Sequence, residues 1–237
     1  MKTNRILILS ALSGLSLFLA CEPAKPKHQE NHNKTEESLS SNRVVLFEND
    51  YAQAIRVTLN PGEELPPHEG KSRLIYSLSD YTIDWAGEGD APLVRNWKKG
   101  DIHVHEEGGL SLKNSGSTQA EWIAFTRKEG ALPTTSGQNL EADLTNLNPN
   151  PFKQLFDNKQ FVATEVNLAP GKTIPLHDGL PRLVYSLSDY SIRYQGPKEE
   201  TMEKSFQKGT VHWHDAGPHA IENIGNTEAH FLIVGYK

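Results

Sequence analysis

The sequence predicts an all-β protein built from two tandem copies of one small β-rich domain. Three observations lead to this prediction. One long segment recurs farther along the chain, short stretches alternate apolar and polar residues, and turn-forming residues return about every eight to twelve positions. This spacing is typical of sandwiches and barrels of short strands. No segment has the long 3.6-residue period of an amphipathic helix.

The composition limits the classes of protein that the chain can belong to. It has 237 residues, 36% hydrophobic and 23% charged, which is enough to form the core of one large or two small domains. The net charge is −6. Nucleic acids and anionic lipid headgroups attract clustered Lys and Arg, so we expect neither as the main partner. The single Cys excludes an intrachain disulfide and any zinc or iron–sulfur site made of cysteines.

Residues 1–20 have the pattern of a secretory signal peptide. Lys2 and Arg5 precede an apolar run from Ile6 to Ala20, which is shorter than the roughly 20 residues that a transmembrane helix needs. The run ends in Leu-Phe-Leu-Ala-Cys21, which resembles the lipobox of bacterial lipoproteins. This resemblance implies cleavage before Cys21, a lipid on that cysteine, and membrane anchoring on the periplasmic or cell-surface side of the envelope. The alternative is an ordinary signal peptide followed by an incidental cysteine.

The rest of the chain divides into a tether, two repeats and a connector. Residues 21–42 are rich in Pro, Lys, Glu, Asn and Ser, with almost no apolar residues, and this predicts a flexible tether that carries the lipidated cysteine. We place the first repeat at 43–128 and the second at 152–237. The connector, 129–151, is loop-like, with one short helical turn expected around 141–144.

The repeats are an internal duplication. Residues 43–128 align with 152–237 without a gap, at an offset of 109 residues, and roughly a third of the aligned positions are identical. The identical features include a Pro-Gly turn, one histidine and most of a nine-residue run. They are Leu59-Asn-Pro-Gly62, His68 and Arg73-Leu-Ile-Tyr-Ser-Leu-Ser-Asp-Tyr81 in the first repeat, and Leu168-Ala-Pro-Gly171, His177 and Arg182-Leu-Val-Tyr-Ser-Leu-Ser-Asp-Tyr190 in the second.

Each repeat has the patterns of short strands joined by turns. Residues 54–59 alternate apolar and polar side chains before the Asn-Pro-Gly turn, and 74–79 alternate in the same way. Residues 121–126 and 230–235 are rich in β-branched and aromatic side chains and are expected to close the two repeats as strands. Asn223 and Gly225 are expected to form a tight turn.

Two motifs of the second repeat resemble those of the cupin superfamily. The first is Pro-Gly171-x5-His177, and the second is Gly209-x2-His-Trp-His-x-Ala-Gly-Pro-His219-x3-Asn223-x-Gly. The resemblance covers nearly all of 43–237. It implies two tandem jelly-roll barrels, a bicupin, whose lumen often holds a divalent metal bound by histidines and a Glu. Functions in this superfamily range from dioxygenases and isomerases to binding of sugars and hormones, so the fold alone does not assign one.

The sequence departs from the family pattern. The first motif usually has His-x-His followed by Glu, but Gly70 and Gly179 stand at the second histidine position, and apolar residues stand where the Glu is expected. The histidine of the second motif is His219 in the second repeat and Leu110 in the first. Only the second repeat therefore has a candidate pair, His177 with His219.

The resemblance predicts a divalent metal, iron, manganese, zinc, nickel or copper, held by this pair and one further ligand. His214 is the first candidate because it lies two residues from His212, so both point to the same face of a strand. Asp189 and Tyr185 are weaker candidates. The alternatives are that His177 and His219 only bond strand ends to each other, and that His212 lies on the surface.

Arg182, Tyr185 and Trp213 are the candidate substrate-binding residues. An arginine directed into the lumen would bind a carboxylate through two parallel hydrogen bonds. The competing interpretation is structural: both repeats contain the same Arg and Asp, so the two pairs would be internal ion pairs that brace the barrels. These pairs are Arg73 with Asp80 and Arg182 with Asp189. Trp213 is either a core residue or part of the lumen wall.

Three functional hypotheses follow. In the first, an envelope lipoprotein of bicupin type binds a divalent metal and a small polar or anionic molecule in the second repeat. In the second, the same site makes the protein a metal-dependent dioxygenase, isomerase or lyase. In the third, the protein is a metal-free scaffold. The contrast between Leu110 and His219 favours a working site, and the missing Glu weakens the oxygenase hypothesis. Cupin barrels commonly pair through their N-terminal strands, which leaves open a homodimer or pairing of the two repeats within one chain.

Overall fold

A computed structural model describes residues 42–86, 91–133, 147, 150–196 and 201–237. The predicted signal peptide, the lipobox cysteine Cys21, almost all of the predicted tether and the helical turn expected around 141–144 lie outside these residues. The described part of the chain contains no helix of the length and apolar character that a membrane crossing requires.

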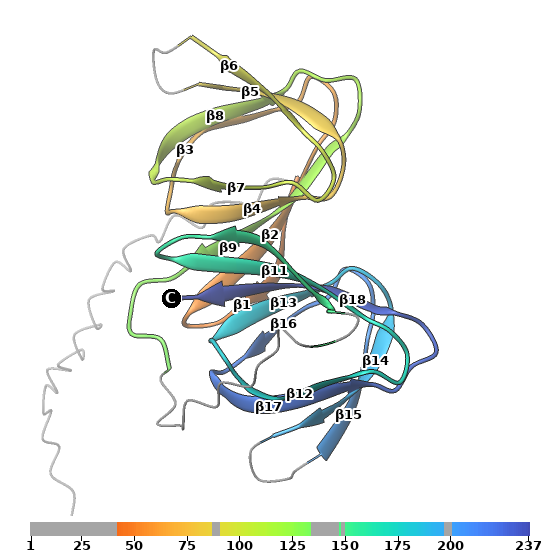
Figure 1. The fold of residues 1–237 in the computed structure, drawn as a ribbon. Helices are drawn as coiled ribbons and strands as arrows, with labels where there is room; N and C mark the ends of the chain where they lie inside the picture. Colours follow the sequence, from red (N-terminus) through yellow and green to blue (C-terminus); the bar gives the residue numbers. More distant parts are fainter. Residues whose placement is uncertain (1–41, 87–90, 134–146, 148–149, 197–200) are drawn as a thin grey trace, which may run out of the picture. The chain divides into compact units, whose positions relative to one another are not determined.

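The all-β prediction is confirmed (Figure 1). In the described part of the first repeat, the strands are β1 (Arg43–Glu48), β2 (Ala52–Leu59), β3 (Glu64–Gly70), β4 (Arg73–Ser77), β5 (Tyr81–Ala86), β6 (Leu93–Trp97), β7 (Ile102–His105), β8 (Gly108–Asn114) and β9 (Ala120–Arg127). In the second repeat they are β10 (Phe152–Asp157), β11 (Phe161–Leu168), β12 (Thr173–Gly179), β13 (Arg182–Ser186), β14 (Tyr190–Gln195), β15 (Thr201–Phe206), β16 (Val211–His214), β17 (Gly217–Asn223) and β18 (Ala229–Tyr236).

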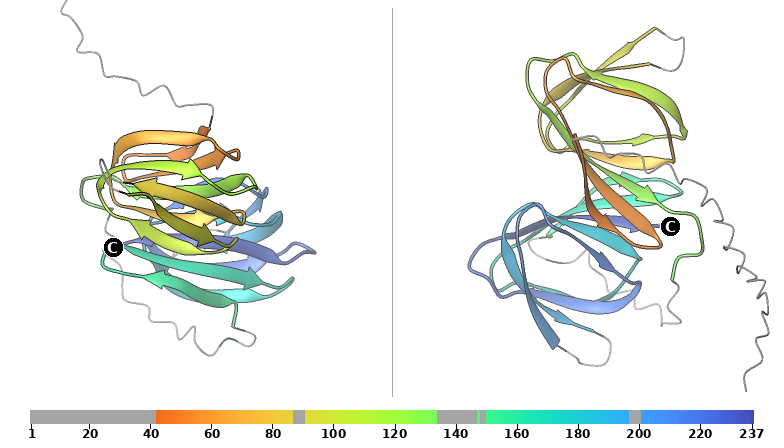
Figure 2. Two further views of the ribbon diagram at one scale, coloured as in Figure 1. Left: turned by 90° about the horizontal axis from the view of Figure 1, so that it is seen from above. Right: turned by 180° about the vertical axis from the view of Figure 1, so that it is seen from behind.

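Each repeat forms a barrel of two antiparallel sheets, as the views in Figures 1 and 2 show. The first barrel has the sheets β1-β2-β9-β4-β7 and β3-β8-β5-β6, and the second has β10-β11-β18-β13-β16 and β12-β17-β14-β15. The two strand orders are identical once the repeats are aligned. Even the irregularity in the first strand pair recurs, between Val45 and Phe47 and between Gln154 and Phe156. The duplication in sequence is therefore a duplication of the whole topology.

The predicted turn at Asn223 forms. Its side-chain amide donates hydrogen bonds to the carbonyls of Leu168 and Thr227, at 2.7 and 2.8 Å, and its Oδ1 accepts one from the N–H of Gly225 at 3.0 Å. Asn223 is fully buried and supplies hydrogen-bond partners to three backbone groups of the turn. Asn114 makes the same three bonds in the first barrel.

The two five-stranded sheets are apolar on both faces because each contributes to two cores. On β13, Val184 points into its own barrel, whereas Leu183 and Tyr185 join a core shared with the other repeat. The same alternation on β4 places Ile75 inside the first barrel and Leu74 in the shared core. Because both faces of these strands are buried, β4 and β13 are nearly continuous apolar runs and do not alternate apolar with polar residues.

The contacts between the repeats are reciprocal. Edge strand β1 contacts β16, and its counterpart β10 contacts β7. Ser72 donates a hydrogen bond to Gln160 at 2.8 Å, and the rings of Tyr51 and Trp213 stack with centroids 5.7 Å apart. The N-terminal strand of each repeat thus lies against the other repeat within one chain.

Candidate functional site

The second barrel contains a cavity of about 140 Å³ between its two sheets. Strand alternation brings Arg182 and His214 to the inner face of the five-stranded sheet, where they lie opposite each other on β13 and β16. His177 and His219 are opposite each other on β12 and β17 of the other sheet and line the same cavity. The structure therefore brings together four of the residues that the sequence singled out.

Arg182 is the buried charge of this cavity. Its residue is only 4% exposed, and its Nη1 donates to the carbonyl of Leu180 at 2.9 Å. Its Nη2 donates to Nε2 of His219 at 2.7 Å. Among the residues that the structure describes, it forms no ion pair with a carboxylate. Burial lowers the pKa of Arg182 to about 10, so the guanidinium still carries its charge at neutral pH.

The predicted ion pairs with Asp80 and Asp189 are wrong. Oδ1 of Asp189 accepts from the backbone N–H of Lys208 at 2.7 Å, at an exposed turn. Asp80 likewise bonds to the backbone of Lys99 and pairs with the ammonium of Lys98 at 3.0 Å. Both carboxylates serve turns between strands, because the arginines point into the barrels.

The hydrogen bonds of His177 and His219 fix their tautomers. Nδ1 of His177 lies 2.8 Å from the carbonyl of Pro175, and Nδ1 of His219 lies 3.1 Å from that of Gly217. A carbonyl only accepts, so each Nδ1 carries the hydrogen and each Nε2 has a lone pair. The lone pair of His219 accepts the hydrogen bond from Arg182. The two rings pack against each other with centroids 4.2 Å apart.

The histidines around Arg182 are neutral. Burial, and then the charge of Arg182, lowers the pKa of His219 to about 3 and that of His214 to about 2. Burial and then the charges of Lys204 and Arg182 lower the pKa of His212 to about 4. Burial also lowers the pKa of His177. The cavity wall therefore combines one positive charge with uncharged imidazoles.

The predicted metal ligands do not fit a divalent metal as they lie. The described residues contain no group of three or more His, Cys, Asp or Glu side chains that could hold one. The ring centroids of His214 and His219 are 6.4 Å apart, and the Nε2 lone pair that a metal would use on His219 is bonded to a guanidinium. A metal cation beside Arg182 would also meet like-charge repulsion.

Arg182 takes the space of the missing ligand. A Cβ added at Gly179, where the cupin motif that this sequence resembles has its second histidine, would overlap Nη1 of Arg182 and lie 2.7 Å from Cε1 of His219. A larger residue at position 179 and a guanidinium in this position therefore exclude each other. The glycine at position 179 is therefore what allows the guanidinium of Arg182 to lie in the cavity.

The other predicted residues lie elsewhere. Tyr185 is 6% exposed in the core shared by the two repeats, and the Trp213 ring packs against the same core while its Nε1 donates to Asp215 at 2.7 Å. Asp189 lies at its exposed turn. The expectation that His212 lies on the surface is wrong. It lines the cavity and stacks on Phe206 with centroids 4.1 Å apart.

A second, outer cavity of about 380 Å³ adjoins the first. The two share Ile192, His212 and His214 in their walls. The outer cavity is lined in addition by Trp213, one of the predicted substrate-binding residues, and by exposed residues of both charges, Lys204 and Asp215. The buried arginine belongs to the inner cavity.

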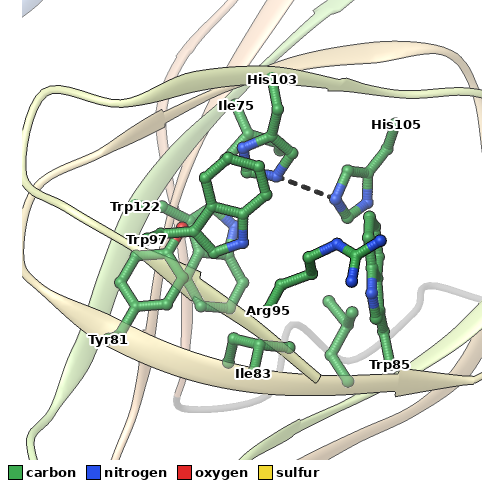
Figure 3. Close-up of a pocket in the computed structure, with 10 residues that line it drawn as sticks. Ile75, Tyr81, Ile83, Trp85, Arg95, Trp97, His103, His105 and Trp122 are labelled. Atoms are coloured by element: carbon green, nitrogen blue, oxygen red, sulfur yellow. Dashed lines mark hydrogen bonds between the residues drawn. The ribbon is translucent and has the colours of Figure 1, made fainter. Parts of the chain in front are cut away.

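The cavity found among the described residues of the first barrel is much smaller. The lumen of this barrel is filled by Trp85, Trp97 and Trp122, and the remaining cavity is about 20 Å³, close to the room of a single water molecule (Figure 3). Trp97 stacks on His103 with centroids 3.6 Å apart, and Nε2 of His103 lies 3.0 Å from Nε2 of His105. This barrel is closed by its own side chains.

The cause of this difference is visible in the aligned repeats. The three indoles correspond to Tyr194, Phe206 and Phe231 in the second repeat, which are smaller rings. The residues predicted from the sequence to form the site included the histidines but did not include these three positions as determinants of volume. These substitutions are the signal that could have identified the open barrel, because lumen volume depends on the side chains that fill it.

No protein-family profile matches the sequence. No curated protein matches it either. Solved structures do resemble it. AerE from Microcystis aeruginosa superposes with a TM-score of 0.60 at 16% identity, over 82% of this chain and 91% of AerE. A variant of oxalate decarboxylase from Bacillus subtilis gives 0.58 at 16% identity, over 81% of this chain and 71% of the decarboxylase. At these identities the likeness concerns the fold. The chain has the fold of the cupin superfamily, in its two-barrel form.

Proposed function

We propose that this protein is a cell-envelope lipoprotein whose second barrel binds a small organic anion through Arg182, without a metal. The observation that carries the proposal is the buried guanidinium with no carboxylate partner among the described residues. The first barrel acts as a structural partner that covers one face of the binding barrel.

A buried, unpaired charge is costly. Removing an ion from water costs several kcal/mol in real proteins, and the loss is recovered only by an opposite charge with good hydrogen-bond geometry. Arg182 donates to one carbonyl and one neutral imidazole, and neither supplies a negative charge. A guanidinium has five N–H groups, so others remain for a ligand. An anion in the cavity would supply the missing charge.

The location is proposed from the N-terminal sequence. The run before Cys21 resembles a lipobox, and the polar, apolar-poor stretch after it would hold the barrels away from the membrane surface. A protein anchored to the envelope in this way could act as a receptor or carrier for a soluble ligand. The alternatives in which the protein is a metal-dependent enzyme require a metal site. The neutral histidines of the inner cavity could form such a site only if the Arg182 side chain moved away from His219.

Two measurements on the full chain in detergent test the proposal. Calorimetric titration with small carboxylates and phosphate should detect one site per chain that weakens roughly 10- to 100-fold in Arg182→Gln, the range expected for losing a charged hydrogen bond. Arg73→Gln is the matched control, because it removes the equivalent buried arginine from the closed barrel. Arg182→Lys, which keeps the charge, should recover part of the affinity.

Elemental analysis of the same samples tests the absence of metal from the proposed site. We expect no stoichiometric iron, manganese, zinc, nickel or copper in the wild type. About one metal per chain that is lost in a His177→Ala/His219→Ala double variant would contradict the proposal and support the metal-dependent enzyme alternatives. Anion affinity unchanged in a folded Arg182→Gln variant would also contradict it.

A further inference from the structure

We infer that the anion is a carboxylic acid with a compact apolar body about the size of one six-membered ring. This inference rests on the proposed function, because it takes Arg182 as the residue that binds the negative group. It adds the shape and polarity of the rest of the ligand, which the cavity wall determines.

The wall of the inner cavity is apolar on both sheets. Away from Arg182 and the histidines, much of the wall is apolar and includes Ile174, Val184, Ile192, Ile221, Phe231 and Ile233. All but Ile233 are buried residues of the barrel core. A small hydrophilic anion would leave these side chains facing water or empty space. A ligand with an apolar body would bury against them and gain free energy in proportion to the apolar surface removed from water.

The volume fixes the approximate size of that body. The cavity measures about 140 Å³. A cavity of about 150 Å³ with an aliphatic and aromatic wall holds a benzene molecule. A single ring or a branched chain of similar bulk therefore fits, whereas acetate and phosphate would fill only a fraction of the space.

The charge distribution favours a monoanion. Arg182 is the buried charged residue among the described residues that line the inner cavity, and the imidazoles beside it are neutral at pH 7. Asp178, the one carboxylate that lines the cavity in the described chain, is exposed. A further cation, Lys204, lines the outer cavity instead. A second negative group inside the inner cavity would have no buried partner.

The first barrel provides a way to test the size requirement. Phe231 corresponds to Trp122, one of the indoles that fill the first lumen. Phe231→Trp should therefore fill the second cavity with a side chain that this fold already accommodates at the equivalent position. Trp122→Phe changes the matching position of the other barrel and leaves the inner cavity of the second barrel as it is, so it is the control.

The experiment compares five probes on the full chain by calorimetry: benzoate, cyclohexanecarboxylate, acetate, phosphate and benzyl alcohol. We expect the two ring-bearing acids to bind about tenfold or more tightly than acetate and phosphate, because only they bury an apolar body. Benzyl alcohol has the ring without the charge and should bind at least about tenfold more weakly than benzoate. Phe231→Trp should lose benzoate binding, and Trp122→Phe should keep it.

The outcomes separate the inference from the proposed function. If acetate or phosphate binds as tightly as benzoate and this binding depends on Arg182, the ring-sized ligand is wrong and anion binding stands. If benzoate affinity is unchanged in a folded Phe231→Trp variant, the ligand lies outside this cavity and the inference is wrong. If benzyl alcohol matches benzoate, or if no probe binds in an Arg182-dependent manner, the proposed function fails together with the inference.

Discussion

The guanidinium of Arg182 donates a hydrogen bond to Nε2 of His219 across 2.7 Å, inside the second barrel. Nδ1 of the same ring bonds to the carbonyl of Gly217, so the ring has no second lone pair to offer. One contact therefore occupies the lone pair that His219 could offer to a metal and places a positive charge beside it. The loss of the side chain at Gly179 makes room for it.

Replacing the arginine should open the site to metal. In Arg182→His the positive charge is gone, His219 regains its Nε2 lone pair, and a further imidazole joins His177 and His214 around the cavity. We expect this variant to bind Co²⁺ at least about tenfold more tightly than the wild type, with a visible absorption band from histidine coordination. The matched variant Arg73→His should gain nothing, because Leu110 replaces the second-motif histidine there. Equal Co²⁺ affinity in Arg182→His and wild type would argue that the guanidinium does not exclude metal.

Stability should decrease in mild acid. The pKa of His219 is about 3 in the folded protein against an ordinary value of 6.5, because burial disfavours the charged ring. Below about pH 6.5 the unfolded chain binds a proton that the folded protein does not, so the free energy of unfolding falls between pH 6.5 and about pH 3 and is level above neutral pH. His212 and His214 act in the same direction, since their pKa values are also lowered.

The variant His219→Leu isolates one of these contributions. It installs the residue of the first repeat and removes one buried titrating group, so urea unfolding from pH 7.5 to 4.5 should become less steep in pH by up to about 1.4 kcal/mol per pH unit. An unchanged slope would show that His219 is not held neutral in the folded state.

Asn223 should be among the most sensitive positions for stability. It is fully buried and makes three hydrogen bonds to backbone groups, two as donor and one as acceptor. Asn223→Ala leaves those backbone groups without their partner and should lower the free energy of unfolding by about 2–4 kcal/mol. The equivalent Asn114→Ala should behave alike in the first barrel. A loss below about 0.5 kcal/mol in chemical denaturation, the size of an ordinary surface change, would contradict the assigned role.

The envelope location has its own test. Cys21→Ala removes the residue that the lipobox resemblance marks for lipidation. We expect the wild type to incorporate labelled palmitate and to sediment with membranes, and the variant to lose the label and leave the membrane fraction. Label and membrane association that persist in Cys21→Ala would mean that the cysteine is incidental.

The repeat made the fold predictable. The gapless match between the two halves, the alternating strands and the two motifs together gave the all-β class and the tandem barrels. The site was predicted only in part, because alternation does not say which face of a strand points inward. On β13 both faces are apolar, since one packs in the barrel and the other in the core shared by the repeats. Tyr185 was therefore expected near the ligand although it lies on the opposite face from Arg182.

The volume of each barrel lumen was the second feature that could not be predicted from the sequence. Histidines are conspicuous in a metal-site motif, but a cavity depends on what fills the space around them. The exchange of Trp85, Trp97 and Trp122 for smaller rings is distributed over three strands, the neighbouring β5 and β6 and the more distant β9. Its consequence emerges only when those strands close into one barrel and the remaining volumes, about 20 and about 140 Å³, can be compared.

The most direct test of the central claim is a benzoate titration of metal-analysed wild type beside Arg182→Gln and Arg73→Gln, with the fold of each variant checked by circular dichroism. The account predicts one binding site per chain without stoichiometric metal, at least about tenfold weaker in Arg182→Gln and unchanged in Arg73→Gln. Binding that survives in a folded Arg182→Gln variant, or that requires a stoichiometric metal, would contradict it.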